Sequence, residues 1–541
     1  MDTIEDKKPG IKKKVIIGLV IAFAVLVVAL VTGYFICDYY YGSHFMKGTI
    51  VNGIDVSKMS MKELNDKVQD YTLTIVERTS DGDYEEETIK GSQMGLKLCK
   101  DSGLQKILDD QQGGKWLFGK GKEYTMDELT EYDQDAWQEL LDSLMCFADD
   151  FITSPENAYV APYDEKKNTF ELVEEVQGNE AVRDRVDEVL SKAVSKLDKT
   201  VNLEDEDCYE KPEVTVDNED IQAFYKKLKQ YAGEHITYTF GDDVEELTGE
   251  DICKWLTIDY DNYTVSLNSE NVTEYVSYLR WKYDTIFGTR EFQTSYGQTV
   301  TIEGGDYGWW MNKEEEIAGL TAMIEAGESG DRTPVYYQEA AQYGENDYGN
   351  TYVEINLTAQ HLFLYVDGEK KLESDFVSGN AATGHSTPAG TYAVTYTERY
   401  AILRGDTYET MVSYWMPFNE DIGLHDATWK YEFGSQFYQH AGSHGCVNLP
   451  YGVAKEIFGY LQKGMPVICY HLPGTESTSV TLQTEEEMAQ SVIDAINEIP
   501  TASNKKNQTE NARMLYNDLN RAAKAKVTNY NELITYESQY E

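Results

Sequence analysis

Residues 440–450 read HAGSHGCVNLP, and a further histidine, His425, lies upstream in the segment GLHDATW. A thiolate is the attacking species of a cysteine enzyme, and a nearby imidazole commonly generates it near neutral pH. Cys446 follows Gly445, which permits a tight turn whose backbone N–H groups can face an oxyanion. From spacing alone, either His425 or His444 can serve as the base. The stretch predicts a cysteine nucleophile on a turn of small residues.

Two other interpretations of the same residues remain open. Cys446 by itself can be a small buried hydrophobic residue, as we expect for Cys469 in the strand-like segment PVICY. Alternatively, four potential zinc ligands lie close together in the sequence: His425, His440, His444 and Cys446. The seven Cys of the chain are dispersed and contain no C-x-x-C pair, which argues against a zinc ribbon and against a disulfide framework.

The region around this stretch, residues 350–473, is dense in predicted strands. Segments such as YVEINLT, HLFLYVDG and GTYAVTYTE combine β-branched and aromatic residues, and turn residues separate them. The region also holds six of the eight His. We expect one mainly-β domain here.

Several motifs of this region resemble a known family. SHGCVN at 443–448, preceded at a distance by LHDATW at 424–429, resembles the signature of the L,D-transpeptidases, whose catalytic domain is of the YkuD type. The likeness extends to TPAGTY at 387–392 and YWMPF at 414–418, and it covers about 350–471. It implies a β-sandwich-like catalytic fold, with the nucleophile under a flap over the active-site groove.

The resemblance also implies a reaction, the crosslinking of peptidoglycan. Cys446 would attack the carbonyl between the third residue of a tetrapeptide stem and its terminal D-Ala, releasing D-Ala. The acyl-enzyme would then pass to the side-chain amine of another stem's third residue. Carbapenem-type inhibitors are expected to acylate the same cysteine. No cofactor and no metal is expected.

The family assigns roles to individual residues around the nucleophile. Its base is the upstream histidine, which maps to His425, held by the backbone carbonyl of Asp426. His444 and Gly445 lie at the turn, and backbone N–H groups there, with that of Cys446, would form the oxyanion hole. Ser443 belongs to the same turn and is expected to help orient it.

Four further residues are expected to contact substrate on the strength of the same motifs. They are Asn448, Tyr414, Trp415 and Met416. Many family members carry Arg where this chain has Asn448, although Asn occurs in the Gram-positive subgroup.

The N-terminal part of the chain contains a candidate membrane anchor. Residues 15–36 read VIIGLVIAFAVLVVALVTGYFI, which is long enough to cross a hydrocarbon core of about 30 Å. Residues 1–14 carry five Lys against three acidic residues, and Asp38 follows the stretch, so the N-terminus is expected in the cytoplasm. A cleaved signal peptide is disfavoured by length and by the lack of an A-x-A site, and a lipoprotein signal by Ile36 before Cys37. We expect a single-pass protein of the cell membrane with its catalytic domain in the cell wall space.

Strand-like and helix-like segments alternate between the anchor and the catalytic region. We expect two α+β domains, at 48–205 and 214–337, and a linker, YGENDYGN, that ends near Asn350. TFELVEEVQGNEAVRDRV and VTIEGGDYGWWMNKEEEI look like two copies of one strand, glycine turn and helix unit, with two unrelated domains as the alternative. VNGIDV and the units after it resemble the peptidoglycan-binding domains that precede this catalytic domain in Gram-positive enzymes. They can bind peptidoglycan or act only as a spacer.

The C-terminal residues, 480–541, are expected to form a small helical module. Thr484-x-x-Glu487 predicts the start of one helix, and residues 511–525 predict a second. The module resembles small three-helix modules of bacterial surface proteins.

The charge of the chain excludes one class of partner. The 47 Lys and Arg against 95 Asp and Glu give a formal net charge of −48, which repels phosphate backbones, so nucleic-acid binding is not expected. Two alternatives to a transpeptidase remain. Water can accept the acyl group, which gives an L,D-carboxypeptidase, or the catalytic block can be inactive in a wall-binding protein. The intact Cys446, His425, His444 and Gly445 argue against an inactive block.

Overall fold

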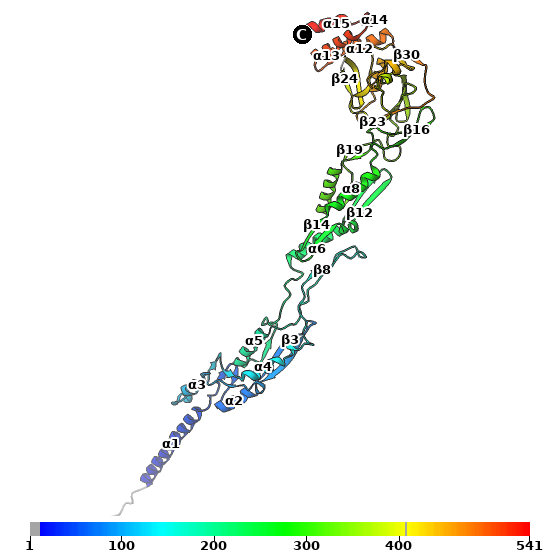
Figure 1. Cartoon of the computed structure of the whole chain (residues 1–541). Helices are drawn as coiled ribbons and strands as arrows, with labels where there is room; N and C mark the ends of the chain where they lie inside the picture. The colour runs from blue at the N-terminus through cyan, green and yellow to red at the C-terminus, as the bar shows by residue number, and fades with distance from the viewer. Residues whose placement is uncertain (1–10, 406–407, 541) are drawn as a thin grey trace, which may run out of the picture. The chain divides into compact units, whose positions relative to one another are not determined.

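The computed structural model describes residues 11–405 and 408–540. It divides into two units, Met1–Tyr163 with Phe170–Lys226, and Asp164–Thr169 with Lys227–Glu541. Figure 1 shows the elements in chain order. Most of the predicted cytoplasmic segment, 1–14, lies outside the described residues.

The first unit begins with a long apolar helix, α1 (Ile11–Tyr41). Residues Lys13–Tyr41 have a mean hydropathy of 3.2, and no other helix of the described residues is long and apolar enough to cross a membrane. The side chains from Val15 to Val31 are exposed, so nothing in the unit buries this stretch.

An α+β domain follows α1. Its sheet has the order β10-β3-β4, in which β3 (Thr72–Arg78) is antiparallel to β4 (Tyr84–Lys90) and parallel to β10 (Thr200–Asn202). α5 (Arg183–Lys196) precedes β10 and buries one stripe that includes Leu190. The other helices and strands of this unit are β1 (Ile50–Val51), β2 (Ile54–Asp55), α2 (Met61–Gln69), β5 (Lys97–Leu98), α3 (Leu104–Asp110), β6 (Glu123–Tyr124), β7 (Thr130–Glu131), α4 (Gln134–Asp142), β8 (Tyr159–Val160) and β9 (Leu172–Val173).

The second unit starts with a domain of the same sheet topology. β11 (His235–Phe240) is antiparallel to β12 (Asp243–Thr248) and parallel to β18 (Gly330–Arg332), and α9 (Lys313–Ala326) precedes β18 as α5 precedes β10. This shared order favours the repeat interpretation of the two sequence segments. The remaining elements of the region are α6 (Glu219–Ala232), α7 (Gly249–Lys254), β13 (Leu256–Asp259), β14 (Thr264–Leu267), α8 (Ser269–Tyr283), β15 (Arg290–Gln293), β16 (Thr299–Ile302), β17 (Trp310–Met311) and β19 (Tyr336–Gln338).

The mainly-β catalytic domain consists of two sheets. The first has the order β22-β21-β20-β29-β23 and the second the order β24-β25-β26-β28. Their strands are β20 (Tyr352–Asn356), β21 (His361–Val366), β22 (Glu369–Asp375), β23 (Gly390–Ala393), β24 (Glu398–Gly405), β25 (Tyr408–Asn419), β26 (Ile422–Asp426), β28 (Val447–Leu449) and β29 (Pro466–Tyr470), with α10 (Tyr438–Ala441) and α11 (Tyr451–Phe458) between them. Apolar side chains of both sheets, such as Val353 and Leu424, form one buried core. This is the expected sandwich-like architecture.

The helical C-terminus packs on the long hairpin of the second sheet. α12 (Glu485–Glu498) begins at the predicted capping box of Thr484 and Glu487. The expected helix over 511–525 is different: α13 (Lys505–Asp518) starts earlier and ends at Leu519, whose ψ of 145° leaves the helical region, and Asn520 then caps α14 (Arg521–Lys524). Together with α15 (Tyr530–Tyr540), these helices share a buried core with Met411 of β25. β27 (Glu432–Gly434) pairs with β30 (Val480–Leu482) just before the module.

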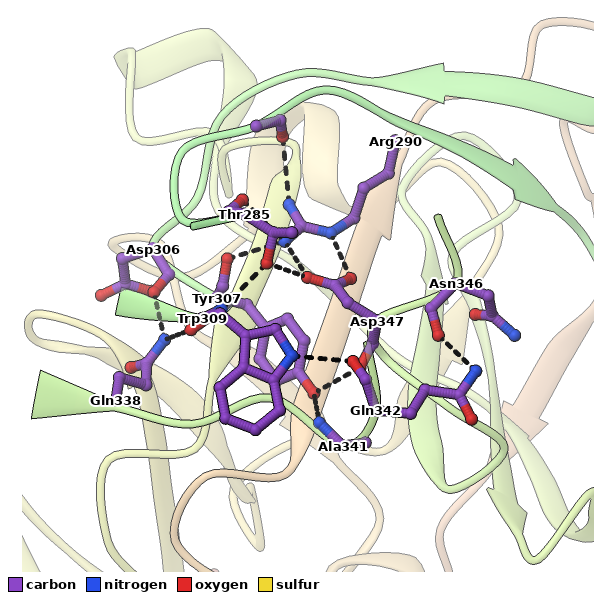
Figure 2. A network of polar contacts seen from close by, with 12 residues as sticks. Thr285, Arg290, Asp306, Tyr307, Trp309, Gln338, Ala341, Gln342, Asn346 and Asp347 are labelled. Atoms are coloured by element: carbon purple, nitrogen blue, oxygen red, sulfur yellow. Dashed lines mark hydrogen bonds and ion pairs between the residues drawn. The ribbon is translucent and has the colours of Figure 1, made fainter. Parts of the chain in front are cut away.

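A polar network ties the α+β domain of the second unit to the segment that leads into the catalytic domain (Figure 2). Arg290 of β15 donates to both carboxylate oxygens of Asp347, at 2.8 and 2.6 Å, and Thr285 donates to the same carboxylate at 2.6 Å. Arg290 also donates to the backbone oxygen of Tyr307 at 2.9 Å. The segment 343–350, which reads as a linker in the sequence, is therefore folded into a fixed junction.

Candidate active site

The nucleophile candidate lies where a glycine turn enters a strand. β28 runs parallel to β26, with Val447 opposite Leu424 and Asn448 opposite His425. Cys446 immediately precedes β28, so the register brings it beside the β26 strand that carries His425. Residues about twenty positions apart in the sequence therefore lie side by side on neighbouring strands.

Gly445 is required at this turn on two grounds. Its φ of +129° lies in the region that residues with a side chain rarely adopt. A Cβ at this position would also lie 2.9 Å from the side chain of Ile422. The Ser443 hydroxyl braces the turn, because it accepts from the Gly445 N–H at 3.0 Å and donates to the Cys446 carbonyl at 2.6 Å. Thr387 of the TPAGTY segment donates to the Gly445 carbonyl at 2.5 Å.

His425 is almost fully buried and is held by its neighbour in the chain. Only 3% of the residue is exposed, and its Nδ1 lies 2.9 Å from the backbone oxygen of Asp426. A carbonyl oxygen can only accept, so Nδ1 carries the hydrogen and Nε2 keeps its lone pair. The rings of Trp415 and Trp429 pack near the imidazole, at centroid distances of 5.8 and 5.9 Å.

Burial keeps both members of the predicted catalytic pair uncharged at rest. Desolvation raises the pKa of the Cys446 thiol to about 11, and the hydrogen bond between its Sγ and the Asp421 backbone oxygen, at 3.5 Å, leaves it a donor. Desolvation also lowers the pKa of His425 to about 4, although the hydrogen bond to the Asp426 carbonyl opposes this. At neutral pH the site therefore holds a thiol and a neutral imidazole.

Asp426 supports the site with its side chain as well as with its carbonyl. The carboxylate accepts the Tyr414 N–H at 2.8 Å, which ties β26 to β25. Only 1% of Asp426 is exposed, and desolvation raises its pKa to about 6.

A cavity of about 410 Å³ opens at Cys446. His425, His444, Ser443 and Asn448 line it together with the cysteine. The other lining residues are Leu403 and Thr410 from the β24–β25 hairpin, Trp429 and Lys430 after β26, Gly442, and Asp518 from α13. The hairpin and the C-terminal module thus contribute walls that the sequence motifs do not indicate.

The residues expected to contact substrate separate into two groups. Asn448 lines the cavity, and its buried side-chain oxygen has no hydrogen-bond partner among the described residues. Tyr414 and Met416 instead belong to the core between the sheets, and they do not line the cavity. Trp415 packs against Cys446 in a small apolar cluster. Side chains alternate along β25, so Tyr414 and Met416 point into the core between the sheets, and Trp415 points to the opposite face, where Cys446 lies.

The candidate zinc ligands are not assembled into a site. Within the described residues, no group of three or more His, Cys, Asp or Glu side chains could hold a metal ion. His444 instead lies edge to face with His385, at a centroid distance of 4.7 Å.

Comparison with known proteins gives matches to two parts of the chain. A family model of the L,D-transpeptidase catalytic domain, YkuD, matches residues 350–469, and a model of a putative peptidoglycan binding domain matches residues 214–332. The L,D-transpeptidase of Enterococcus faecium, solved as a cysteine-to-serine mutant, is 34% identical over 45% of this chain and 98% of its own, with a TM-score of 0.39. The chain therefore belongs to the L,D-transpeptidase family. It is a peptidoglycan L,D-transpeptidase.

Two further solved structures are similar to shorter parts of the chain. The catalytic domain of the E. faecium L,D-transpeptidase acylated by ertapenem is 43% identical over 23% of this chain and 98% of its own, with a TM-score of 0.21. An L,D-transpeptidase from Stackebrandtia nassauensis is 29% identical over 26% of this chain and 60% of its own, with a TM-score of 0.20. No curated protein sequence matches the chain at a significant level.

Proposed function

We propose that this enzyme crosslinks peptidoglycan through an acyl-enzyme on Cys446, with His425 as the base. The observation that carries the proposal is the fixed tautomer of His425, which directs a basic nitrogen away from Asp426 in the same cavity that Cys446 lines. A base must also be oriented through its other nitrogen, and the Asp426 carbonyl supplies that contact.

The first half of the reaction forms a thioester and releases D-Ala. Cys446 Sγ attacks the carbonyl between the third stem residue and D-Ala as its proton passes to Nε2 of His425. The C–N bond then breaks, and the same proton goes to the departing amine. Since both resting groups are neutral, proton transfer accompanies attack, and a stable thiolate is not required beforehand.

The second half restores the thiol. The side-chain amine of an acceptor stem attacks the thioester carbonyl, the C–S bond breaks, and a proton of the amine returns through His425 to sulfur. The Cys446 N–H is the oxyanion donor we propose, since the Gly445 N–H already donates to Ser443. His444 contributes to the shape of the turn.

Digestion of peptidoglycan products by a muramidase, followed by mass spectrometry, tests this reaction. The wild-type chain is expected to convert tetrapeptide stems into crosslinked dimers lacking one D-Ala, and Cys446→Ala should form none. Tripeptide monomers as the sole product would identify an L,D-carboxypeptidase instead. A protein without either product would be the inactive wall-binding alternative.

We also propose that β-lactams of the carbapenem class acylate Cys446. The adduct with ertapenem of the E. faecium catalytic domain, 43% identical to this chain, supports the proposal. Intact-mass measurement should find one adduct on the wild type and none on Cys446→Ser.

We propose that α1 is an uncleaved anchor and that the enzyme works outside the cytoplasmic membrane. The Asp38 carboxylate, near the end of α1, accepts from the N–H groups of Gly113 and Gly114 and from Trp116 Nε1. Cleavage before Asp38 would remove α1 residues that pack on this loop, including Tyr34 against Trp116. A protease added to intact protoplasts should degrade nearly the whole chain, and protection of residues 350–473 would contradict this topology.

We propose peptidoglycan as the ligand of the middle domains. Exposed aromatic rings on the second α+β domain support it, because such rings stack on sugar faces: Trp281 is 81% exposed beside Tyr278, and Phe287 is 66% exposed beside Trp310. Sedimentation with isolated walls should weaken for Trp281→Ala with Phe287→Ala in the full chain. Unchanged sedimentation would leave these domains as a spacer.

A further inference from the structure

The C-terminal module is fixed to the hairpin that covers the cavity. Glu498 of α12 accepts from Arg399 at 3.0 Å and from the Tyr400 hydroxyl at 2.6 Å, and both partners lie on β24. Met411 of β25 is buried in the core of the module. The helices therefore hold the hairpin in place over the active site.

The same module places one acidic residue in the cavity wall. Asp518, the last residue of α13, lines the cavity together with Leu403 and Thr410 of the hairpin and with Cys446. It is the only carboxylate among the described residues that line it. Lys430, the one cationic side chain of that lining, donates to the Ala441 backbone oxygen at 2.7 Å.

The chemistry of a transpeptidase requires a particular kind of second substrate. A new peptide bond forms only if an amine attacks the acyl group, and an alkyl amine in water at neutral pH is a protonated cation. A carboxylate in the wall near the thioester attracts such a cation, whereas water, the competing acceptor, gains nothing from it. A single side chain can thereby favour crosslinking over hydrolysis.

We propose that Asp518 binds the ammonium group of the acceptor stem and so sets the preference of the acyl-enzyme for amine over water. This inference rests on the proposed acyl-enzyme. The acceptor arrives as a cation and releases one proton to solvent. The neutral amine then attacks the thioester, and its second proton passes through His425 to the sulfur of Cys446.

The test compares Asp518→Asn with wild type in the full chain. The readouts are the rate of carbapenem acylation and the ratio of crosslinked to hydrolysed product at increasing acceptor concentration. We expect an unchanged acylation rate and an about tenfold higher KM for the amine acceptor, the size expected for losing one partly solvated ionic contact. Glu510→Gln, an exposed carboxylate on the same helix but outside the cavity, is the matched control and should behave as wild type.

Two results would overturn the assignment of Asp518. An unchanged KM for the amine excludes the contact, and an equal loss of acylation and crosslinking shows that the variant only disturbs the hairpin. Failure of the proposed function is distinguishable from both, because the wild type itself would then form no covalent adduct.

A second, independent observation concerns the loop that packs on α1. Residues 113–122 read GGKWLFGKGK, with three Lys and no acidic residue in a chain whose net charge is −48. Trp116 packs on Tyr34 and Tyr41 of α1, with both centroid distances 5.7 Å. Tyr34 lies within the apolar stretch, so the loop reaches back to the level at which that stretch ends.

The exposed side chains of this loop are those of a membrane interface. Phe118 is 95% exposed and Leu117 50% exposed, although both side chains are apolar. Aromatic residues concentrate at the boundary between lipid and water, and Lys near the surface of an anionic leaflet contributes about 1 kcal/mol each. The boundary between lipid and water lies where the apolar stretch of α1 ends. Because the loop packs on α1 at this level, it contacts the boundary without a movement of the domain.

The structure assigns this loop to an anionic bilayer surface, with Phe118 and Leu117 in the acyl region and the three Lys at the headgroups, an assignment that rests on the proposed anchor role of α1. The test uses the full chain in vesicles that contain a lipid with a photoreactive group on its acyl chain. After illumination, mass spectrometry should find the peptide 116–120 labelled in addition to α1. The hairpin tip at 80–83, in the same unit, is the internal control and should stay unlabelled.

Varying the lipid charge tests the role of the three Lys separately from that of Phe118 and Leu117. Labelling of 116–120 should rise several-fold when phosphatidylglycerol replaces half of the phosphatidylcholine. Replacing Lys115, Lys120 and Lys122 by Gln should abolish that rise. Labelling confined to α1 would overturn the assignment, as would a response to lipid charge that persists in the triple variant.

Discussion

The Nδ1 atom of His425 lies 2.9 Å from the backbone oxygen of Asp426, the residue that follows it in the chain. The contact joins two consecutive residues, so it depends only on the local geometry at the end of β26. It fixes the tautomer, and it leaves Nε2 as the only nitrogen of the ring that can accept a proton. The assignment of His425 as base rests on this relationship.

His425→Ala should therefore lose acylation almost as completely as Cys446→Ala. A general base typically contributes 10²–10⁴-fold, and we expect a loss of about that size in the rate of carbapenem acylation. His444→Ala should retain a partly reactive thiol, because His444 shapes the turn. A His425→Ala variant that acylates normally, with an unaltered thiol pKa, would reverse the assignment.

The acidic limit of the acylation rate should lie near pH 4. A base must be neutral, and burial lowers the pKa of His425 to about 4, so its neutral form persists until the pH falls through that value. With an ordinary pKa near 6.5, the rate at pH 5 would already be lower by about thirtyfold. Stopped-flow acylation between pH 3.5 and 8 measures the limit.

Asp426 titrates in the same range and needs its own control. Burial raises its pKa to about 6, so a step near pH 6 can come from this carboxyl. Asp426→Asn keeps the backbone carbonyl and removes the titration. The limit near pH 4 should survive in this variant, and its movement to about 6.5 would refute the burial argument.

Gly445→Ala should abolish acylation. A Cβ would meet Ile422 at 2.9 Å, and φ is +129°, so the turn must move and carry Cys446 with it. Gly452→Ala is the matched control, because no atom lies within 4 Å of its Cβ and it sits in α11. We expect that variant to keep full activity and to gain up to about 1 kcal/mol in unfolding free energy.

Asp347→Asn should destabilise the packing of the segment 343–350 on the α+β domain of the second unit. The ion pair with Arg290 has 5% and 1% of its side chains exposed, and removing one partner of a buried pair costs about 3–5 kcal/mol. Glu250→Gln breaks an exposed pair with Lys254 on α7 and should change stability by less than about 1 kcal/mol. Chemical denaturation of the two variants gives the comparison, and equal effects would argue against a fixed junction.

Local patterns of the sequence predicted much of this structure. Thr484 with Glu487 forms the predicted capping box at the start of α12. Such caps depend on four consecutive residues, so tertiary packing has little influence on them. The end of α13 was missed for the opposite reason. Residues 511–525 contain no glycine or proline, and the break at Leu519 comes with packing of that residue into the core of the module.

The sequence also did not predict which way the side chains of β25 point. Tyr414, Trp415 and Met416 belong to a recognisable motif, but both sides of β25 are covered, by the opposite sheet and by the helical module. A strand buried on two faces has no polar face to mark which residues reach a groove.

The sequence by itself determined the candidate nucleophile, the glycine turn and the family, because these depend on residues within a few positions of Cys446. Tertiary structure alone decided what surrounds them. The pairing of β26 with β28 brings His425 beside the cysteine, and the docking of α13 places Asp518 in the same cavity wall. Both depend on contacts between residues about 20 to 70 positions apart, which no local pattern specifies. Burial then sets the charges of the site, since removal from water, and not residue type, keeps the thiol and the imidazole neutral.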